Sequence, residues 1–381
     1  MYLISTMDIK TEEMDIFTAL RKCLKMSKDA VKHPKTLLFL SSDTSLREIG
    51  NIIHEEFNDI TTLGIHSILF HLGNTGNNHI FIAIFEERDE ITVIPGLIEN
   101  VSTCPVMSIA SLQNDVIRIA PGKDDTICLE FTTGGEEMLV STLNAAFGKF
   151  NIKLIGGTVN ASHEGMITAV VYNGKVYSDA CIYLLVKNNK GRIFTLAENI
   201  FARFNNKPLM ATKVDVNKKA LIELNGEPAA DVLSKELNIS KSQLSKSAMH
   251  YPLGKYVGNE CFTIGYHDID TNGTLYNYKQ VNLNDLLFIT KLQNYREIFD
   301  NTIETIKNEI PNIGFILSID CINRYKLYHF ENYFDEYAAK WADLFPVHFG
   351  LVSSGEQYYR QHINQAMVCA VFENVEPIII F

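Results

Sequence analysis

The sequence has 381 residues, of which 46% are hydrophobic and 21% are charged. This composition is typical of folded globular proteins and excludes a disordered chain, and the length is sufficient for two hydrophobic cores. The formal net charge of −11 argues against nucleic-acid binding, because recognition of phosphate groups requires a basic face.

The cysteines and the N-terminal segment indicate a cytoplasmic protein. The seven cysteines are odd in number, scattered and mostly within apolar segments, which favours buried reduced thiols over a disulfide framework. The N-terminal segment has no basic stretch followed by an apolar core, so no secretory signal is evident. No run approaches the ~20 apolar residues of a membrane-spanning helix, and we expect no membrane insertion.

Three similar units dominate the predicted secondary structure. The hydrophobic pattern first predicts a helix over about residues 12–30. Units of strand, helix, glycine-ended strand and second strand then occupy residues 36–85, 127–172 and 314–372. We therefore predict a mixed α/β fold, built from related βαββ-type units whose mixed sheets are flanked by helices.

A polar segment at residues 201–207, just before Pro208, marks a predicted domain boundary. We expect two domains, residues 1–205 and 206–381. In the second half, Pro228 stands where the first turn of a helix tolerates proline, and Pro311 ends a longer helix. The elements predicted there are a strand at 220–226, a helix from Pro228 to about Leu237, and a helix from Asp285 or Gln293 to Glu309.

The segment Ser353-Ser354-Gly355 is the first candidate for nucleophilic catalysis, because it follows a predicted strand. Its spacing is G-x-x-S-S-G, which differs from the G-x-S-x-G turn that presents a strained serine, and no histidine and acid can be assigned as its partners. We interpret it as a polar loop and expect no enzymatic activity. A serine hydrolase that uses Ser353 or Ser354 stays an alternative.

The 11 histidines form no recognisable metal motif. Neither H-E-x-x-H nor C-x-x-C occurs, so the sequence predicts no dedicated zinc or iron site. Haem needs only one axial histidine, and histidine spacing therefore leaves haem open. Glu136 and Glu137 begin a predicted helix after Gly134-Gly135, where their charge favours an ordinary capped helix over an anion site.

The remaining candidates are groups suited to bind a small ligand. Polar loops follow two glycine-ended strands, one at Gly156-Gly157 and one at Gly350, and we interpret these loops as the walls of a small-molecule site. Glycine lets a ligand or another backbone come close, or allows a left-handed turn. Arg324 is a planar charged fork suited to a carboxylate, either on a ligand or on Glu356 in a fixed pair. The predicted ligand-binding residues are Gly156, Gly157, Thr158, Cys321, Arg324, Ser353, Ser354, Gly355, Glu356 and Asn364.

These segments resemble the FIST family of bacterial sensory proteins, which have an N-terminal and a C-terminal FIST domain. Gly156-Gly157 and the segment Asn173–Asp179 are similar to the N-terminal signature of that family. The resemblance is co-linear over roughly residues 36–372. The segments similar to the C-terminal signature are Leu224–Ala229, Tyr251–Gly254, Cys321–Arg324, Ser354–Glu356 and Ile363–Gln365.

The resemblance implies a small-ligand sensor whose ligand is an amino acid or a related metabolite. We expect a stand-alone sensory protein without a cofactor, which binds an amino acid or a small carboxylate and signals through a partner such as a histidine kinase or a chemoreceptor. The expected mechanism is a ligand-dependent change in the relative placement of two domains. Some stand-alone members of the family bind haem and sense nitric oxide together with a histidine kinase. A haem-based sensor is therefore the second alternative.

Overall fold

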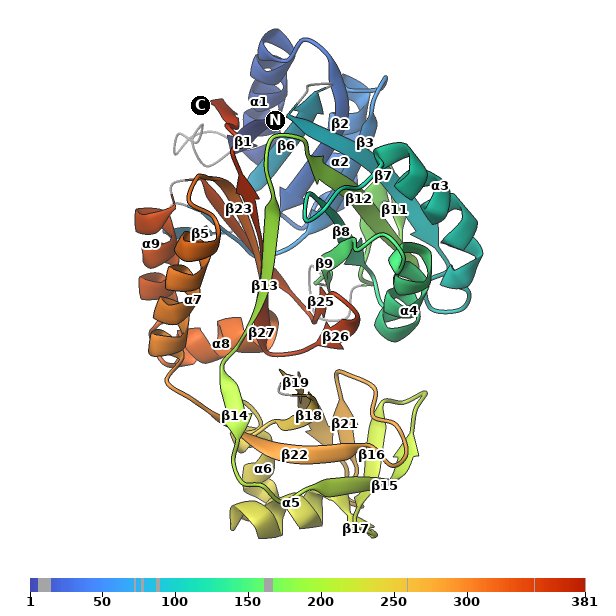
Figure 1. Ribbon diagram of the computed structural model, residues 1–381, viewed down its shortest axis with the longest axis vertical. Helices are drawn as coiled ribbons and strands as arrows, with labels where there is room; N and C mark the ends of the chain where they lie inside the picture. The colour runs from blue at the N-terminus through green and yellow to red at the C-terminus, as the bar shows by residue number, and fades with distance from the viewer. Residues whose placement is uncertain are drawn as a thin grey trace.

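The computed structural model describes residues 1–5, 15–71, 73–76, 79–86, 90–160, 167–258, 260–345 and 347–380. The chain forms a large body and a small lobe, and the lobe lies below the body in Figure 1. Residues 201–292 form the small lobe, and the other described residues form the body. Among the described residues, no helix is both long enough and apolar enough to span a membrane.

Three sheets make up the body, and the same three-strand pattern lies at the centre of each. One strand pairs in parallel with the strand after its helix and antiparallel with a later strand. The first sheet has the order β11 (Lys175–Tyr177), β10 (Val170–Tyr172), β3 (Thr61–His66), β2 (Pro34–Ser41), β6 (Ile80–Glu86), β1 (Tyr2–Ser5) and β28 (Ile378–Ile380). The second has the order β26 (Gln361–Ile363), β25 (Glu356–Tyr358), β9 (Lys153–Thr158), β8 (Thr126–Thr132), β12 (Ala180–Asn188) and β7 (Ile91–Glu99). The third has the order β13 (Ile193–Asn199), β27 (Ala366–Glu373), β23 (Ile313–Cys321), β24 (His348–Ser353), β4 (Leu69–His71) and β5 (Asn74–Gly76).

A hairpin from each unit completes the sheet of another unit. Strands β4 and β5 follow β3 of the first sheet along the chain, but β4 pairs with β24 of the third. Strands β10 and β11 follow β9 of the second sheet, but β10 pairs with β3 of the first. Strands β25 and β26 follow β24 of the third sheet, but β25 pairs with β9 of the second. The three units are therefore interlocked in a ring.

Helices cover the outer face of each sheet, whereas the inner faces of all three sheets share one hydrophobic core. The outer helices are amphipathic, and α1, for example, buries Leu20, Cys23 and Leu24 along one stripe. The first sheet is covered by α1 (Ile16–Ala30) and α2 (Leu46–Glu56). The second is covered by the 3-10 turn Pro105–Ser108, α3 (Ile109–Ile119) and α4 (Glu136–Phe147), and the third by α7 (Tyr295–Glu309), α8 (Ile322–Phe330) and α9 (Phe334–Leu344).

The small lobe has its own sheet and its own hydrophobic core. Its helices are α5 (Ala229–Leu237) and α6 (Lys241–Ser247). Its sheet has the order β19 (Glu260–Ile264), β18 (Leu253–Val257), β22 (Leu286–Leu292), β15 (Leu209–Asp215), β16 (Ala220–Leu224), β21 (Leu275–Asn277) and β20 (Tyr266–Ile269), with β14 (Phe201–Arg203) beside β22 and β17 (Glu227–Pro228) beside β16.

The predicted fold class and the three units are confirmed, with corrections to individual elements. The strand expected at 166–172 to close the second unit is β10, which belongs to the first sheet. The second unit is closed by β12, which pairs antiparallel with β8. The helix with an alternative start at Asp285 begins at Tyr295, because the preceding residues form β22. The helix expected in the third unit is two helices, separated where Asn332 has a φ of 54°. The expected start of the first helix lies outside the described residues.

The predicted domain boundary at residues 205 and 206 lies between β14 and β15, a few residues after the chain enters the small lobe. After β22 the chain returns to the body, and β25, β27 and β28 pair with β9, β13 and β1. Strands from both sides of the boundary therefore share each body sheet. The division of the chain into residues 1–205 and 206–381 as family domains stays a prediction.

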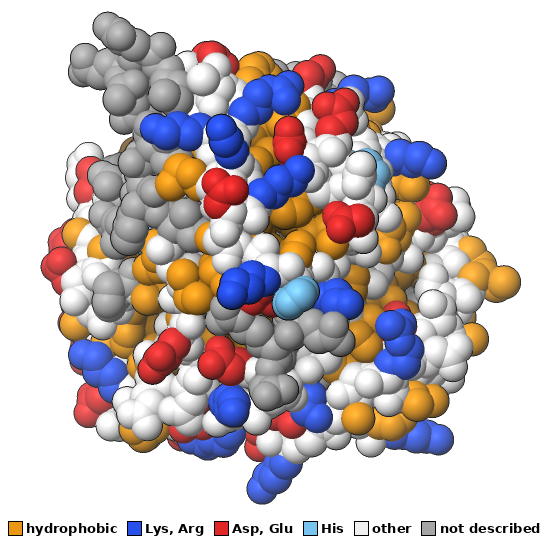
Figure 2. All heavy atoms as spheres, turned by 90° about the horizontal axis from the view of Figure 1, so that it is seen from above, with side chains coloured by type: hydrophobic (Ala, Val, Ile, Leu, Met, Phe, Trp, Pro, Cys, Tyr) orange, Lys and Arg blue, Asp and Glu red, His pale blue; other side chains and the backbone are white. Residues whose placement is uncertain are grey.

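The exterior mixes charge of both signs. Figure 2 shows the end of the body that bears α1, where Lys and Arg side chains are interspersed with Asp and Glu, and hydrophobic side chains show between them.

Gly350 tests how tightly the interlocked hairpins pack. A Cβ at this position would lie 2.0 Å from Cζ of Phe70, a buried ring on β4 that also contacts Phe334 with a centroid distance of 5.5 Å. Because the ring cannot withdraw, we expect Gly350→Ala to lower the free energy of unfolding by about 1–3 kcal/mol. Urea unfolding would measure the change. Gly265→Ala, whose Cβ would meet its nearest atom at 3.3 Å, is the milder control, and equal losses in the two variants would contradict this account.

Candidate functional site

The two loops predicted as walls of one site lie side by side. Ser353 ends β24, and the following hairpin brings β25 against β9. In this register Glu356 is opposite Gly157, and Gln357 is opposite Gly156. The exchange of the β25–β26 hairpin therefore joins segments about 200 residues apart in the sequence. We call residues 353–365 the site hairpin.

The glycines of β9 are explained by close contacts within the protein. A Cβ on Gly157 would lie 2.5 Å from Cβ of Ser353, and a Cβ on Gly156 would lie 2.2 Å from the carbonyl oxygen of Glu130. Neither glycine has a left-handed φ, so the interpretation as a left-handed turn is wrong. Gly355 does have a φ of 148°, and a Cβ there would meet Nε2 of His362 at 2.6 Å.

Glu356 is a fully buried acid at the centre of the site hairpin. Its Oε1 accepts a hydrogen bond from Ser353 Oγ at 2.7 Å, and its Oε2 accepts one from the Ala366 backbone at 3.3 Å. Burial raises the pKa of Glu356 to about 8, although these hydrogen bonds act in the opposite direction. Burial and the neighbouring Glu356 also raise the pKa of the Cys321 thiol. Both groups are therefore mainly protonated at neutral pH.

Arg324 does not pair with Glu356, and this prediction is wrong. Its guanidinium is fully buried behind the third sheet, where it forms an ion pair with Glu198, and its Nε lies 3.0 Å from Oδ1 of Asp320. The rings of Tyr328 and Tyr337 lie 5.0 and 5.6 Å from the guanidinium. The two carboxylates compensate the charge within the protein, but Nε and Nη1 of Arg324 have no hydrogen-bond partner among the described residues. A contact between Arg324 and a ligand stays a prediction.

The two candidate serines have hydrogen-bond partners that are not histidines. Ser353 donates to Glu356, as described, and Ser354 Oγ donates to Oδ1 of Asn160 at 2.5 Å. Among the described residues, neither hydroxyl is hydrogen-bonded to a histidine. The arrangement holds the end of β24 against the segment after β9.

Three buried amide side chains of the site hairpin carry oxygens without a hydrogen-bond partner among the described residues. They are Gln357 Oε1, Asn364 Oδ1 and Gln365 Oε1, and their residues are 0%, 1% and 3% exposed. An unsatisfied buried acceptor of this kind costs about 1–3 kcal/mol, so three of them in nine residues call for an external donor. A bound ligand or water can supply those donors.

A buried ammonium group lies in the same region. Lys279 is 8% exposed, and its Nζ lies 5.6 Å from the centroid of the Phe262 ring. Burial lowers the pKa of Lys279 to about 8, although the nearby Glu137 acts to raise it. None of the ion pairs formed by the described residues includes this lysine. An anionic ligand group would stabilise its charge.

A cavity of about 310 Å³ lies between β13, the site hairpin and β19 of the small lobe. This volume is at the lower end of the ~300–1,000 Å³ typical of small-molecule sites. Phe262 lines the cavity, and Thr263 donates a hydrogen bond to the backbone carbonyl of Asn364 beside it. The lining residues are Thr195, Leu196, Ala197, Asn199, Glu260, Cys261, Phe262, Thr263, Tyr358, Ile363 and Ala366.

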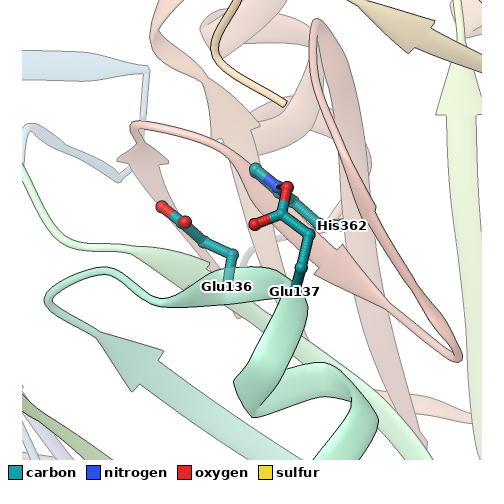
Figure 3. A group of neighbouring side chains, drawn as sticks. All are labelled: Glu136, Glu137 and His362. Carbon is teal, nitrogen blue, oxygen red and sulfur yellow. Dashed lines mark hydrogen bonds and ion pairs between the residues drawn. The ribbon is translucent and has the colours of Figure 1, made fainter. Parts of the chain in front are cut away.

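The start of α4 joins the site hairpin to the small lobe. Figure 3 shows Glu136 and Glu137 on this first turn, with the ring of His362 beside Glu137. Glu137 Oε1 lies 3.2 Å from Nδ1 of His362 and accepts a hydrogen bond from the Gln280 backbone at 3.0 Å. Lys219 of the small lobe lies 2.9 Å from Glu136 and 3.8 Å from Glu137.

Glu136, Glu137 and His362 bring their ligand atoms within 4.8 Å of one another, which is close enough to hold a metal ion. The ammonium of Lys219 already supplies positive charge to both carboxylates. Burial acts to raise the pKa of Glu137, but the hydrogen bond from His362 and the charge of Lys219 outweigh burial and lower it. We therefore interpret the cluster as a contact between the lobe and the body.

Sequence reasoning placed part of this residue set together, and ligand binding by these residues stays a prediction. It brought together the β9 glycines, Thr158, Cys321 and the site-hairpin residues, and Thr158 indeed links Glu136 to Gln357 through hydrogen bonds of 3.1 and 3.2 Å. It missed the lobe residues Lys219 and Lys279, because no local pattern indicates which strand end approaches the body. The paired Glu136-Glu137 was visible at a helix start but was interpreted as a cap. The other missed residues are Gln357 and His362.

Comparison with known proteins gives one family match. A sequence profile of the FIST N domain matches residues 36–227, slightly more than half of the 381 residues. No curated protein matches the chain. Among solved structures, phosphoribosylformylglycinamidine synthase II from Thermotoga maritima aligns over 97% of this chain and 71% of that chain, with 8% identity and a TM-score of 0.18. A TM-score this low gives that likeness no weight.

Glu356 provides a prediction about pH. Between its ordinary pKa of 4.5 and its raised pKa of about 8, the folded chain keeps a proton that the unfolded chain releases. The free energy of unfolding therefore falls as pH rises through this interval. We expect Glu356→Gln to reduce that fall, measured by urea unfolding between pH 5 and pH 8.

The fall in the free energy of unfolding with pH should not vanish in Glu356→Gln, because burial also raises the pKa of Glu130 to about 8 and of Asp320 to about 7. Glu227→Gln, at an exposed position, is the control and should leave the pH dependence unchanged. A pH dependence that is the same in Glu356→Gln and the unmodified chain would show that Glu356 is ionised in the folded state.

Proposed function

The chain belongs to the FIST family, and from this premise we propose that it is a cytoplasmic sensory protein whose ligand is an amino acid or a related small carboxylate. The FIST domain is associated with sensory signal transduction and with small-ligand binding. The family assignment leaves the ligand and the partner of this chain open, and both are proposed. The observation that carries it is the set of unsatisfied amide oxygens on the site hairpin, whose chain neighbours Tyr358, Ile363 and Ala366 line the cavity.

Two kinds of group at the site complement the two ends of an amino acid. The amide oxygens of Gln357, Asn364 and Gln365 accept hydrogen bonds, as an ammonium group requires. Lys279 carries a positive charge that no described carboxylate neutralises directly, as a carboxylate ligand requires. A small carboxylate without an amine would use Lys279 and leave the amide oxygens to water.

The proposed signal is a change in the placement of the small lobe. The lobe is joined to the body through two chain crossings, between β13 and β14 and between β22 and α7. Lys219 and Gln280 of the lobe contact the first turn of α4, next to the site hairpin. A ligand that contacts both parts favours one placement by its difference in affinity. A partner such as a histidine kinase or a chemoreceptor would recognise that placement.

The proposal extends the family assignment to the second half of the chain. Residues 206–381 would be the C-terminal FIST domain, on the resemblance of segments such as Tyr251–Gly254 and Cys321–Arg324. In this view the site hairpin belongs to the C-terminal domain and β9 to the N-terminal domain. The ligand would then lie where the two domains meet.

Lys279→Met tests the proposed carboxylate contact. A hydrogen bond to a charged group contributes about 1.5–3 kcal/mol, so we expect the affinity for the best amino acid or carboxylate ligand to fall about 10- to 100-fold. Isothermal titration calorimetry would measure affinity, after a thermal-shift screen of amino acids and small carboxylates against the intact chain. Lys291→Met, at an exposed position of the same lobe, is the control.

The same experiment has a pH dependence. Lys279 binds a carboxylate in its charged form, so affinity should be constant below about pH 7 and fall as pH rises through about 8. Lys279→Met should lose this fall. A screen in which no amino acid or carboxylate stabilises the chain would contradict the proposed ligand class.

Lys219→Met tests the contact between the lobe and α4. Removing its ammonium leaves Glu136 without its cationic partner across the interface and leaves Glu137 with the Gln280 backbone alone, and we expect a larger average separation of the lobe from the body. Small-angle X-ray scattering of the ligand-free chain would record this as a larger radius of gyration. Lys218→Met is the matched control, because Lys218 pairs at 4.0 Å with Asp215 within the lobe. An unchanged scattering curve for Lys219→Met would contradict the proposal that the contact between Lys219 and α4 sets the placement of the lobe.

A further inference from the structure

A second cavity lies within the hydrophobic core that the inner faces of the three sheets share. Its volume is about 60 Å³, several times the roughly 10–15 Å³ that one water molecule needs. Leu38 of β2, Leu129 of β8 and Leu317 of β23 line it, and these are equivalent strands of the three units. We call this space the junction cavity.

The junction cavity follows from the arrangement of the sheets. Side chains alternate between the two faces of a strand, so residues two positions apart point to the same side. Leu38 and Leu40 both line the cavity, as do Ile127 with Leu129 and Phe315 with Leu317. Three such faces surround a common axis, and their side chains do not fill the middle. Leu129 and Leu317 each stay 6% exposed although they are in the middle of buried strands, because they face this space.

The chemistry of the walls selects the occupant. All the lining residues are hydrophobic, and the backbone groups of their strands pair within the sheets. Water needs two to four polar partners and is not held here, so an empty apolar cavity of this kind admits apolar guests. Several walls are phenylalanine rings, including Phe81 and Phe349 at a centroid distance of 4.6 Å, which gain dispersion energy from any guest in contact with them.

We propose that the junction cavity is a second binding site of this protein, which takes a small uncharged apolar molecule of a few heavy atoms. It is distinct from the polar site between the body and the lobe, because it shares no lining residue with the cavity beside the site hairpin. An occupant contacts strands of all three units at once. Its binding therefore stabilises the interlocked body against separation of the sheets.

Xenon is the probe for the first experiment, because it is apolar, uncharged and small. We expect a saturable change in the ¹²⁹Xe NMR chemical shift with the intact chain. Ala83 of β6 lines the cavity, and Ala83→Leu, which places three more carbons in it, should abolish saturation. Ala202→Leu makes the same exchange at a half-buried strand position of the small lobe and should leave saturation unchanged.

A second variant tests the size of the site independently of how Ala83→Leu folds. Leu129→Ala enlarges the cavity, so benzene should raise the melting temperature of this variant more than that of the unmodified chain. A linear xenon response of the unmodified chain, or saturation that persists in folded Ala83→Leu, would overturn the proposal. So would an equal effect of benzene on Leu129→Ala and the unmodified chain.

Discussion

The exchange of hairpins among the three units is the constraint on which the rest of the structure depends. Each body sheet is complete only when a hairpin of another unit adds to its edge. A hairpin that leaves its own unit must cross to a neighbour, and glycines at the crossing let the partner side chain approach. At Gly350 the ring of Phe70, which lies on the exchanged strand β4, occupies the space where a Cβ would stand. The same arrangement surrounds the central axis with three apolar faces.

The candidate site is a consequence of one of these exchanges. The β25–β26 hairpin leaves the edge of its own sheet and carries Glu356 and the amide side chains to β9 and α4. Glu356 is protected from water on all sides, and its environment favours the neutral acid. The amide oxygens beside it stay unsatisfied. The protein therefore holds polar groups in place without neutralising them, as a site prepared for a polar ligand requires.

The small lobe stands where a ligand can act on its placement. It has a separate core, and polar contacts at the start of α4 join it to the site hairpin. Polar contacts at a partly exposed interface are individually weak, although Phe201, Phe262 and Leu292 of the lobe also pack against the cores of the body. By contrast, Arg324 is enclosed with Glu198 and Asp320 in the third-sheet core and fixes the body.

The sequence by itself determined the elements whose signals are local. Hydrophobic spacing predicted the three units, and the polar residues after glycine-ended strands predicted that Gly157, Ser353 and Glu356 belong to one site. Only the tertiary structure decided that β10 adds to the first sheet, that Arg324 pairs with Glu198, and that Lys219 and Lys279 approach from the small lobe. Periodicity is a property of neighbouring residues. Hairpin exchange and pairing across the lobe depend on contacts between segments about 80–280 residues apart, and no local pattern records them.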